Sequence, residues 1–338
     1  MKNILVISVN WLGDAVFSTP VFRALKENFP QAKISVLCVP RVKDVMALNP
    51  HVDEVIVYDE DGFDRPLLNK MALAGKLRSR GFDAVFILRR SLSRTFLCYL
   101  AGIPVRVGFA GKGWQGLLTH VVHDTGVNAI HRSDVYLRVV ESFGVKVTDR
   151  RSFLEARPDI VSGWRARLLA MGVSPGDRLI AVNTGGNWNL KQWPVECFAE
   201  LVREIENRKI GKVVLPGAEK DVERVKKIAA LSKVNPIITA GDTGISCLSG
   251  LLKCCDLLVT ADTGPLHLAN ALGVGVVALF GPTRPEITGP RGQGACKVIF
   301  KDVGCNRAPC YYLECSDNKC MKAIKVGDVL QAIAEIQG

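Results

Sequence analysis

Short apolar runs alternate with amphipathic segments along the first half of the chain. The apolar run at 2–9 predicts a buried strand, and apolar positions at helical spacing predict a helix at 20–29. Further strands are expected at 33–39, 54–58, 84–88 and 106–109, and further helices from 42 and at 69–80, 93–101 and 133–143. Strands that alternate with helices indicate a parallel sheet with right-handed crossovers.

The alternation starts again after a polar, arginine-rich segment at 149–158. Helices are expected at 163–171, 195–207, 220–231, 245–254 and 325–336, and strands at 178–182, 212–215, 257–261 and 274–280. A chain of 338 residues also exceeds what one hydrophobic core usually supports. We therefore predict an α/β fold with two Rossmann-like domains, whose parallel sheets face a cleft. The predicted divisions are 1–160, 161–324 and a last helix, 325–338, which has no obvious partner in its own half and is expected to pack back on the first domain.

A polar turn and a short helix follow the apolar run at 257–261. Pro265 suits the first turn of that helix, and Thr263 is a plausible N-cap. Free amides and the positive end of the helix dipole favour anions at such a position. His267 could be an ordinary buried histidine, but its place in the first turn favours a ligand contact. We predict an anion site here, with phosphate as the favoured ligand.

The loop at 183–194 also follows a predicted strand and carries Thr184, Gly185, Gly186 and Lys191. Glycines let backbone amides approach a phosphate, and lysine supplies a point charge. The alternative is a surface loop with a solvated lysine. Asp221, after the next strand, is explained equally well as a ribose contact and as the cap of a helix.

The first predicted strand runs into Asn10-Trp11-Leu12-Gly13-Asp14. A dinucleotide fingerprint needs three glycines after the strand, so we do not expect an NAD site. Asp14 taken alone is best explained as an N-cap or first-turn acid of a helix. Loops at the carboxyl edge of a sheet also collect catalytic groups, so the functional alternative is a general base.

Charge narrows the choice of partners. The chain has 44 Lys and Arg against 33 Asp and Glu, a formal net charge of +11, which favours anionic partners. The basic residues are scattered rather than gathered on one helix, so nucleic acid is not expected. Several follow strands or start helices of the first half, where they would suit an acceptor with carboxylates or phosphates. The candidates are Arg89, Arg90, Arg94, Arg106, His131 and Arg132.

The start of the chain reads as a first strand rather than a signal peptide, and no apolar run is long enough to span a membrane. We expect a cytoplasmic protein whose positive charge suits contact with a membrane surface. Eleven cysteines in such a chain are expected to be reduced thiols. The evenly spaced Cys305, Cys310, Cys315 and Cys320 leave a metal site, a redox-labile pair and plain thiols open.

These patterns together resemble the bacterial ADP-heptose:lipopolysaccharide heptosyltransferases, glycosyltransferase family 9, of the heptosyltransferase II type. The matching pieces span nearly the whole chain in the family's order. They are Asn-Trp-Leu-Gly-Asp at 10–14, Ile-Pro-Val-Arg-Val-Gly at 103–108, Lys-Gln-Trp-Pro at 191–194, Asp-Thr-Gly-Pro-Leu-His at 262–267 and Val-Val-Ala-Leu-Phe-Gly-Pro at 276–282.

The resemblance implies a GT-B fold, with an N-terminal acceptor domain and a C-terminal ADP-sugar domain. It implies inverting transfer of heptose from ADP-heptose to the lipopolysaccharide inner core, at the cytoplasmic face of the inner membrane, without a required cofactor. Asp14 matches the family's base. Expected donor contacts are Thr184, Gly185, Gly186, Lys191, Asp221, Asp262, Thr263, Gly264, Pro265, Leu266 and His267. Expected acceptor contacts are Asn10, Trp11, Arg89, Arg90, Arg106, His131 and Arg132.

Three alternatives remain open: a sugar-nucleotide epimerase of GT-B-like architecture, another nucleotide-sugar transferase, and a cysteine-dependent binding module without enzyme activity. An epimerase would turn over one substrate without an acceptor. The Asp14 turn and the basic first half favour the transferase.

Overall fold

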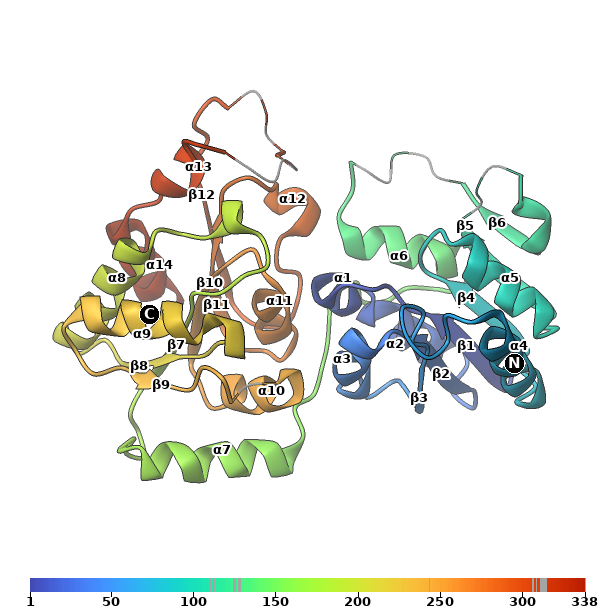
Figure 1. Cartoon of the computed structure of the whole chain (residues 1–338), viewed down its shortest axis with the longest axis horizontal. Helices are drawn as coiled ribbons and strands as arrows, with labels where there is room; N and C mark the ends of the chain where they lie inside the picture. Colours follow the sequence, from blue (N-terminus) through green and yellow to red (C-terminus); the bar gives the residue numbers. More distant parts are fainter. Residues whose placement is uncertain are drawn as a thin grey trace. The chain divides into compact units, whose positions relative to one another are not determined.

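The computed structural model forms two α/β units, Met1–Glu155 and Ala156–Gly338, so the division falls close to the predicted 160/161 boundary (Figure 1). It describes residues 1–109, 111, 113–123, 126, 129–242, 244–305, 307, 309–310 and 315–337. Each unit contains a six-stranded sheet in which all neighbouring strands pair in parallel. The predicted fold class, α/β with two Rossmann-like parallel sheets, is confirmed.

The sheet of the N-terminal unit has the order β3-β2-β1-β4-β5-β6. Its strands are β1 (Asn3–Ile7), β2 (Lys33–Cys38), β3 (Glu54–Val57), β4 (Ala84–Ile87), β5 (Val105–Phe109) and β6 (His120–Val122). Its helices are α1 (Leu12–Phe17), α2 (Thr19–Asn28), α3 (Lys43–Ala47), α4 (Leu67–Ser79), α5 (Leu92–Leu100) and α6 (Arg132–Glu141). The two middle strands, β1 and β4, are almost wholly buried because helices cover both faces, which explains their continuous apolar sequences.

The sheet of the C-terminal unit has the order β12-β11-β10-β7-β8-β9. Its strands are β7 (Leu179–Asn183), β8 (Lys212–Leu215), β9 (Ile237–Ile238), β10 (Leu257–Ala261), β11 (Gly275–Phe280) and β12 (Cys296–Phe300). Its helices are α7 (Pro158–Ala170), α8 (Val195–Asn207), α9 (Val222–Ser232), α10 (Ile245–Lys253), α11 (Gly264–Ala271), α12 (Pro285–Thr288), α13 (Lys319–Lys322) and α14 (Val326–Gln337). Short 3₁₀ turns lie at Pro40–Val42, Gln115–Leu117, Asn189–Lys191 and Glu219–Asp221.

Both sheets have the same topology. In each, the first strand of the unit lies beside the fourth, so the strand order reverses between β1 and β4 and again between β7 and β10. Ligands of open α/β sheets bind at such a switch point, outside the carboxyl ends of the strands. The structure therefore directs attention to the loops after β1 and β4, and to the loops after β7 and β10.

The last helix has packing partners in its own unit. There α14 packs on α8, β11 and β12, while the packing of this helix on the first domain stays a prediction. Its apolar side chains Val329 and Ile333 are fully buried in the same core as Ile180 and Val259 of the central strands. The prediction missed β12, the strand that supplies this partner, because most of its side chains are exposed and its pattern does not resemble a buried strand.

Other elements escaped the sequence analysis because they are short. The strands β6 and β9 and the helices α1, α12 and α13 are too brief to show a period. Within the described residues, no helix combines the length and apolarity needed to cross a bilayer.

Candidate active site

Asp14 lies in the first turn of α1, immediately after the central strand β1. Its carboxylate is partly exposed, and its Oδ1 accepts a hydrogen bond from the Tyr136 hydroxyl of α6 at 2.7 Å. The residue at the N-cap of α1 is Trp11, so the prediction of a first-turn acid is confirmed, whereas the N-cap alternative for Asp14 is wrong. A carboxylate held by one phenol at the switch point is placed to take a proton.

The partner of Asp14 is buried and electrostatically coupled to it. Burial, followed by the charge of the Asp14 carboxylate, raises the pKa of Tyr136 well above its ordinary value, so the phenol remains a hydrogen-bond donor. The guanidinium groups of Arg132 and Arg89 act on the pKa of Tyr136 in the opposite direction. Both predicted acceptor arginines therefore lie within electrostatic reach of the Asp14–Tyr136 pair.

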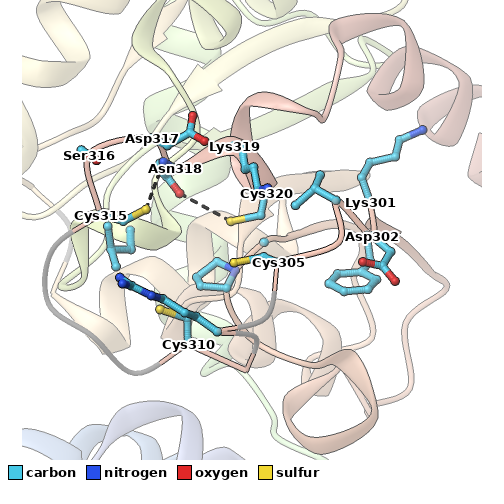
Figure 2. Close-up of a pocket in the computed structure, with 16 residues that line it drawn as sticks. Lys301, Asp302, Cys305, Cys310, Cys315, Ser316, Asp317, Asn318, Lys319 and Cys320 are labelled. Atoms are coloured by element: carbon cyan, nitrogen blue, oxygen red, sulfur yellow. Dashed lines mark hydrogen bonds between the residues drawn. The ribbon is translucent and has the colours of Figure 1, made fainter.

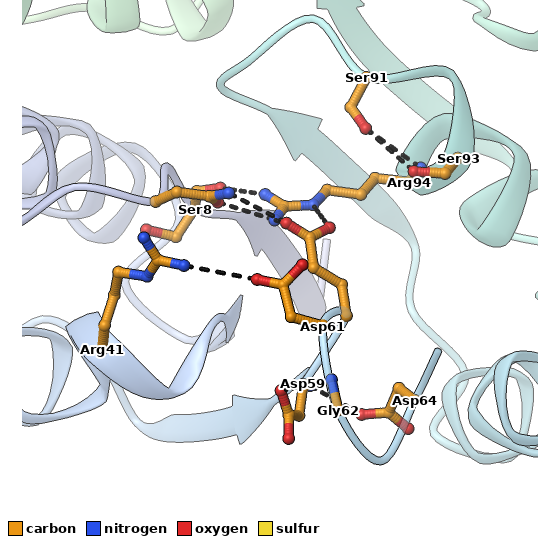
Figure 3. A network of polar contacts seen from close by, with 11 residues as sticks. Ser8, Arg41, Asp59, Asp61, Gly62, Asp64, Ser91, Ser93 and Arg94 are labelled. Atoms are coloured by element: carbon orange, nitrogen blue, oxygen red, sulfur yellow. Dashed lines mark hydrogen bonds and ion pairs between the residues drawn. The ribbon is translucent and has the colours of Figure 1, made fainter. Parts of the chain in front are cut away.

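A buried arginine shapes the loop between β1 and α1. The Arg94 guanidinium, from α5, donates to the Ser8 carbonyl at 2.9 Å and to Asn10 Oδ1 at 2.7 Å. It also forms an ion pair with Glu60 at 2.8 Å, and Asn10 Nδ2 donates to the same carboxylate. Figure 3 shows the guanidinium of Arg94 directed towards Ser8. Arg94 was one of the basic candidates of the first half but not one of the expected acceptor contacts, and the structure buries it within this loop. Asn10 is therefore a structural partner of Arg94 and Glu60.

The remaining predicted acceptor residues divide into two groups. Trp11 is 60% exposed under the Arg41 guanidinium, and Arg89 and Arg90 are exposed, so these side chains lie at the surface of the loop ends. Arg106 instead donates to the Leu117 carbonyl at 2.6 Å. His131 is 5% exposed and caps α6 by accepting from the Ser133 amide.

Arg106 and His131 are thus engaged in holding their own loops. Both residues were grouped with the other basic residues because a side chain that bonds to nearby backbone groups looks the same, in sequence, as one that faces a ligand. Their assignment as acceptor contacts is not favoured by this geometry.

Asp262 is the most heavily bonded carboxylate at the switch point of the C-terminal unit. It follows β10 and is 4% exposed. Its Oδ2 accepts from Lys191 Nζ at 2.6 Å, from Thr283 Oγ1 at 2.7 Å and from Thr288 Oγ1 at 3.4 Å. Its Oδ1 lies 3.3 Å from His267 Nε2. These partners come from the loop after β7, the loop after β11, α12 and α11, so one carboxylate joins four segments.

The electrostatics of this cluster keep Asp262 ionised. Burial would raise the pKa of Asp262, but the hydrogen bond with His267 and the ammonium of Lys191 together hold it well below its ordinary value of 3.8. A buried carboxylate saturated in this way is a poor general base. It is instead the fixed counter-charge that positions Lys191.

The loop that carries Lys191 is anchored by its neighbours. Trp193 is fully buried, its indole N–H donates to the Ile324 carbonyl at 3.0 Å, and its ring packs edge-on against Phe198. Gln192 Nε2 closes the loop by donating to the Gly186 carbonyl at 3.1 Å. The run at 191–194 thus combines a core anchor with a charged side chain at the edge of the sheet.

Two other loops converge on the same edge. A Cβ on Gly185 would lie 2.6 Å from the Asp221 carboxylate, so only glycine permits this approach. Asp221 Oδ2 accepts from the Ala218 amide at 3.0 Å, which caps the short 3₁₀ turn at Glu219–Asp221. Asp221 also occupies the N-cap of α9, where its side chain makes no capping bond among the described residues, and the ribose contact stays a prediction. Thr184 is 1% exposed, and among the described residues its hydroxyl has no hydrogen-bond partner.

The start of α11 corresponds in part to the predicted anion site. Thr263 occupies the N-cap and Pro265 the first turn, but within the described residues the Thr263 side chain makes no capping bond and instead contacts Thr260 Oγ1 at 3.2 Å. Leu266 is fully buried, so its side chain belongs to the core. His267, equally inaccessible at 4% exposure, is a partner of Asp262. The backbone around Thr263–Gly264 remains the candidate for phosphate.

Comparison with known proteins decides the family. The sequence profile of glycosyltransferase family 9 (heptosyltransferase) matches residues 70–320, which is most of the chain. The chain belongs to glycosyltransferase family 9. The predicted family and the predicted glycosyltransferase class are therefore confirmed.

Relatives extend the match over nearly the whole length of this family 9 member. The chain is 29% identical to lipopolysaccharide heptosyltransferase 2 of Salmonella typhimurium over 309 residues, 86% of each protein. The solved structure of E. coli ADP-heptose lipopolysaccharide heptosyltransferase II superposes with a TM-score of 0.80 at 25% identity and covers 99% of this chain and 98% of that one. A family 9 glycosyl transferase from Veillonella parvula shares the fold, with a TM-score of 0.87 at 24% identity over 99% and 97% of the two chains. The GT-B fold predicted from the resemblance is confirmed.

Proposed function

We propose that this chain transfers heptose from ADP-heptose to the inner core of lipopolysaccharide, with inversion at the anomeric carbon. The observation that carries the proposal is that each unit of a family 9 chain has its own switch point with a polar side chain suited to a different step of the transfer. One presents the partly exposed carboxylate of Asp14, and the other presents Lys191 held by the buried Asp262. The lipopolysaccharide heptosyltransferase 2 of Salmonella typhimurium acts, by its name, on lipopolysaccharide, which supports the same acceptor here.

In the proposed reaction, Asp14 removes the proton from an acceptor hydroxyl. The freed oxygen attacks the anomeric carbon of heptose while the bond from that carbon to the diphosphate oxygen breaks. ADP leaves with the bonding electron pair, and the proton stays on Asp14 until it is released to water. Attack from the face opposite ADP inverts the configuration. Tyr136 acts as a positioning residue that fixes Oδ1 of Asp14 and leaves Oδ2 for the acceptor.

The C-terminal unit is proposed to hold the donor. An ammonium group has three N–H bonds, and Asp262 uses one bond of Lys191, so the others can reach the diphosphate. The backbone at Thr263 and Gly264 begins a helix, whose dipole favours the same anion. The buried hydroxyl of Thr184 supplies a further polar group that bonding to a donor would satisfy. Lysine and amides would together stabilise the departing ADP.

Membrane contact is the finer part of this proposal. The start of α4 and the loop before it expose Phe63, Leu67, Leu68 and Met71, each more than half accessible. With the net positive charge of the chain, this surface suits the cytoplasmic face of an anionic membrane. Sedimentation with anionic vesicles tests this point. We expect binding that Leu67→Ser with Leu68→Ser weakens, and equal binding of both proteins would contradict it.

A transfer assay tests the main proposal. We expect the purified chain to move heptose from ADP-heptose to lipopolysaccharide that lacks the outer heptose, and to give a product of inverted anomeric configuration by NMR. Thermal unfolding with ADP, UDP, GDP and NAD gives the nucleotide class, because a ligand that binds the folded state raises Tm. Selective stabilisation by ADP is expected. Turnover of ADP-heptose to an isomer without acceptor would instead indicate an epimerase.

A further inference from the structure

The four evenly spaced cysteines meet at one pocket of the C-terminal unit. Cys305, Cys310, Cys315 and Cys320 all line it, and Figure 2 shows their sulfur atoms around the same space. All four are free thiols in the structure. Leu190 and Pro282 complete part of the wall, so the pocket borders the loops after β7 and β11. The transfer reaction proposed above uses none of these sulfur atoms.

The turn between the last two cysteines is shaped for a thiolate. The Asn318 amide donates to Cys315 Sγ at 3.2 Å. Asn318 has a left-handed backbone with φ of 44°, which bends the chain sharply before Cys320. An N–H group directed at sulfur favours the deprotonated thiol, which is the form that binds metal ions. Two potential ligands are therefore presented by one tight turn.

The other sulfur atoms are held close to this turn by the loop after β11. The Cys310 amide donates to the Pro282 carbonyl at 2.8 Å. A Cβ on Gly281 would lie 3.3 Å from Cys320 Sγ, so the glycine allows that sulfur to lie directly on the loop. Cys305 and Cys315 line the same pocket as Cys320.

We propose that Cys305, Cys310, Cys315 and Cys320 together bind one thiophilic divalent ion, Zn²⁺ or Fe²⁺, as a four-thiolate site. Such ions prefer tetrahedral sulfur ligands, with Zn–S bonds of about 2.3 Å. Among the described residues, no three His, Cys, Asp or Glu side chains already lie close enough together to hold a metal ion. Binding therefore has to draw the four sulfurs inward, and it is coupled to the folding of this segment. Arg307 and Lys319 line the pocket and offset the negative charge of four thiolates.

The place of this site predicts a structural role. Pro282 precedes Thr283, which donates to Asp262, and Leu190 precedes Lys191, which pairs with Asp262. An ion held by the four sulfurs would stabilise both loops without contacting the reacting atoms. Its removal is expected to lower the Tm of the chain.

Metal analysis of the full chain, purified in reducing buffer without chelator, tests the proposal. We expect about one zinc or iron per chain, and less than about a tenth of that in the Cys315→Ser/Cys320→Ser double variant. Cys296→Ser is the matched control, since Cys296 is an exposed cysteine on β12 outside the pocket, and it should keep the metal. Co²⁺ added to the metal-free chain should give the sulfur-to-cobalt charge-transfer and visible bands of tetrahedral thiolate coordination, and should protect four thiols from alkylation.

Three results would overturn the four-thiolate site. These are a reduced wild-type chain that carries no metal and does not take up Co²⁺, a double variant that retains the wild-type metal content, and a disulfide among the four cysteines under the same conditions. If the double variant does not fold, the Co²⁺ spectrum and thiol protection of the wild-type chain still decide. Neither measurement depends on heptose transfer.

Discussion

Asp14 and Asp262 occupy comparable places in the two units but have opposite surroundings. Each follows a strand that borders a switch point, β1 in one unit and β10 in the other. Asp14 is partly exposed and, among the residues that the structure describes, it accepts a side-chain hydrogen bond from Tyr136. Asp262 is 4% exposed and is surrounded by a lysine, a histidine and two threonines. Asp14 follows the first strand of its unit and Asp262 follows the fourth, so the two strands that meet at a switch point support an accessible carboxylate in one unit and a saturated one in the other.

This difference separates two kinds of chemistry. A base must exchange protons with substrate, so it needs an open lone pair and a partner that fixes only one oxygen. A phosphate site needs a positive charge at a fixed position. An ion pair with a buried carboxylate that stays ionised holds the ammonium group of a lysine in one place. In the proposed mechanism, the N-terminal unit therefore accepts the proton of the acceptor hydroxyl, and the C-terminal unit supplies the positive charge that binds the diphosphate. Four substitutions test this division.

The largest effect is expected at Asp14. Asp14→Asn removes the proton acceptor but keeps the shape and the hydrogen bond from Tyr136, so we expect kcat to fall by about 10²–10⁴-fold with little change in Tm. Steady-state transfer assays and thermal unfolding measure both quantities. A variant that keeps more than a tenth of the wild-type kcat would remove Asp14 as the base.

Lys191 should show the reverse pattern, with a loss of stability and of donor binding. Lys191→Ala leaves Asp262 buried without its ammonium partner, and we expect a loss of about 2–3 kcal/mol in the free energy of unfolding, because the lysine is only 19% exposed. The Kd for ADP should rise as well. Lys220→Ala is the control, since Lys220 is an exposed lysine on the same edge and should change stability by about 0.5 kcal/mol or less. Equal effects of the two substitutions would contradict the special place of Lys191.

Acid sensitivity sharpens the contrast further. The pKa of Asp262 is lower in the folded chain than its ordinary value of 3.8. Its ionisation therefore stabilises the fold fully above that value, and the contribution is lost as pH falls below it toward the folded pKa. We expect the stability gap between wild type and Asp262→Asn to shrink as pH is lowered from 5 to 3 in denaturant titrations. A gap that stays constant over this interval would mean that Asp262 is not held ionised by its partners.

The smallest effect is expected at Tyr136. Tyr136→Phe removes the hydroxyl that fixes Oδ1 of Asp14 but keeps the ring in the core, so kcat should fall about tenfold while KM for both substrates stays the same. Initial-rate measurements at varied donor and acceptor separate the two constants. A raised KM with an unchanged kcat would show that Tyr136 binds substrate rather than positions Asp14.

The framework of both units could be predicted from the sequence because it depends on period and burial. The continuous apolar runs at 257–261 and 275–280 indicate buried parallel strands, and the polar turn between them indicated a site. The edge strand β12 was missed because its exposed side chains carry no such pattern, and the packing of α14 was missed with it.

Site roles were predictable only where the backbone determines them. Asp14 and Lys191 follow strands at the carboxyl edge, and the structure places both at switch points. The contacts of Arg94 with Asn10 and of Asp262 with Lys191 join residues 84 and 71 positions apart, so no local pattern contains them. His131 and Arg106 show the converse case, since their side chains bond to nearby backbone groups, and their role as acceptor contacts stays a prediction.

Calorimetric titration of ADP into the Asp14→Asn chain tests the division between the units most directly. We predict the same Kd as for the wild-type chain, although the variant no longer turns over, because every proposed phosphate contact belongs to the other unit. A Kd at least tenfold weaker than that of the wild type would contradict the account, since it would place Asp14 in donor binding.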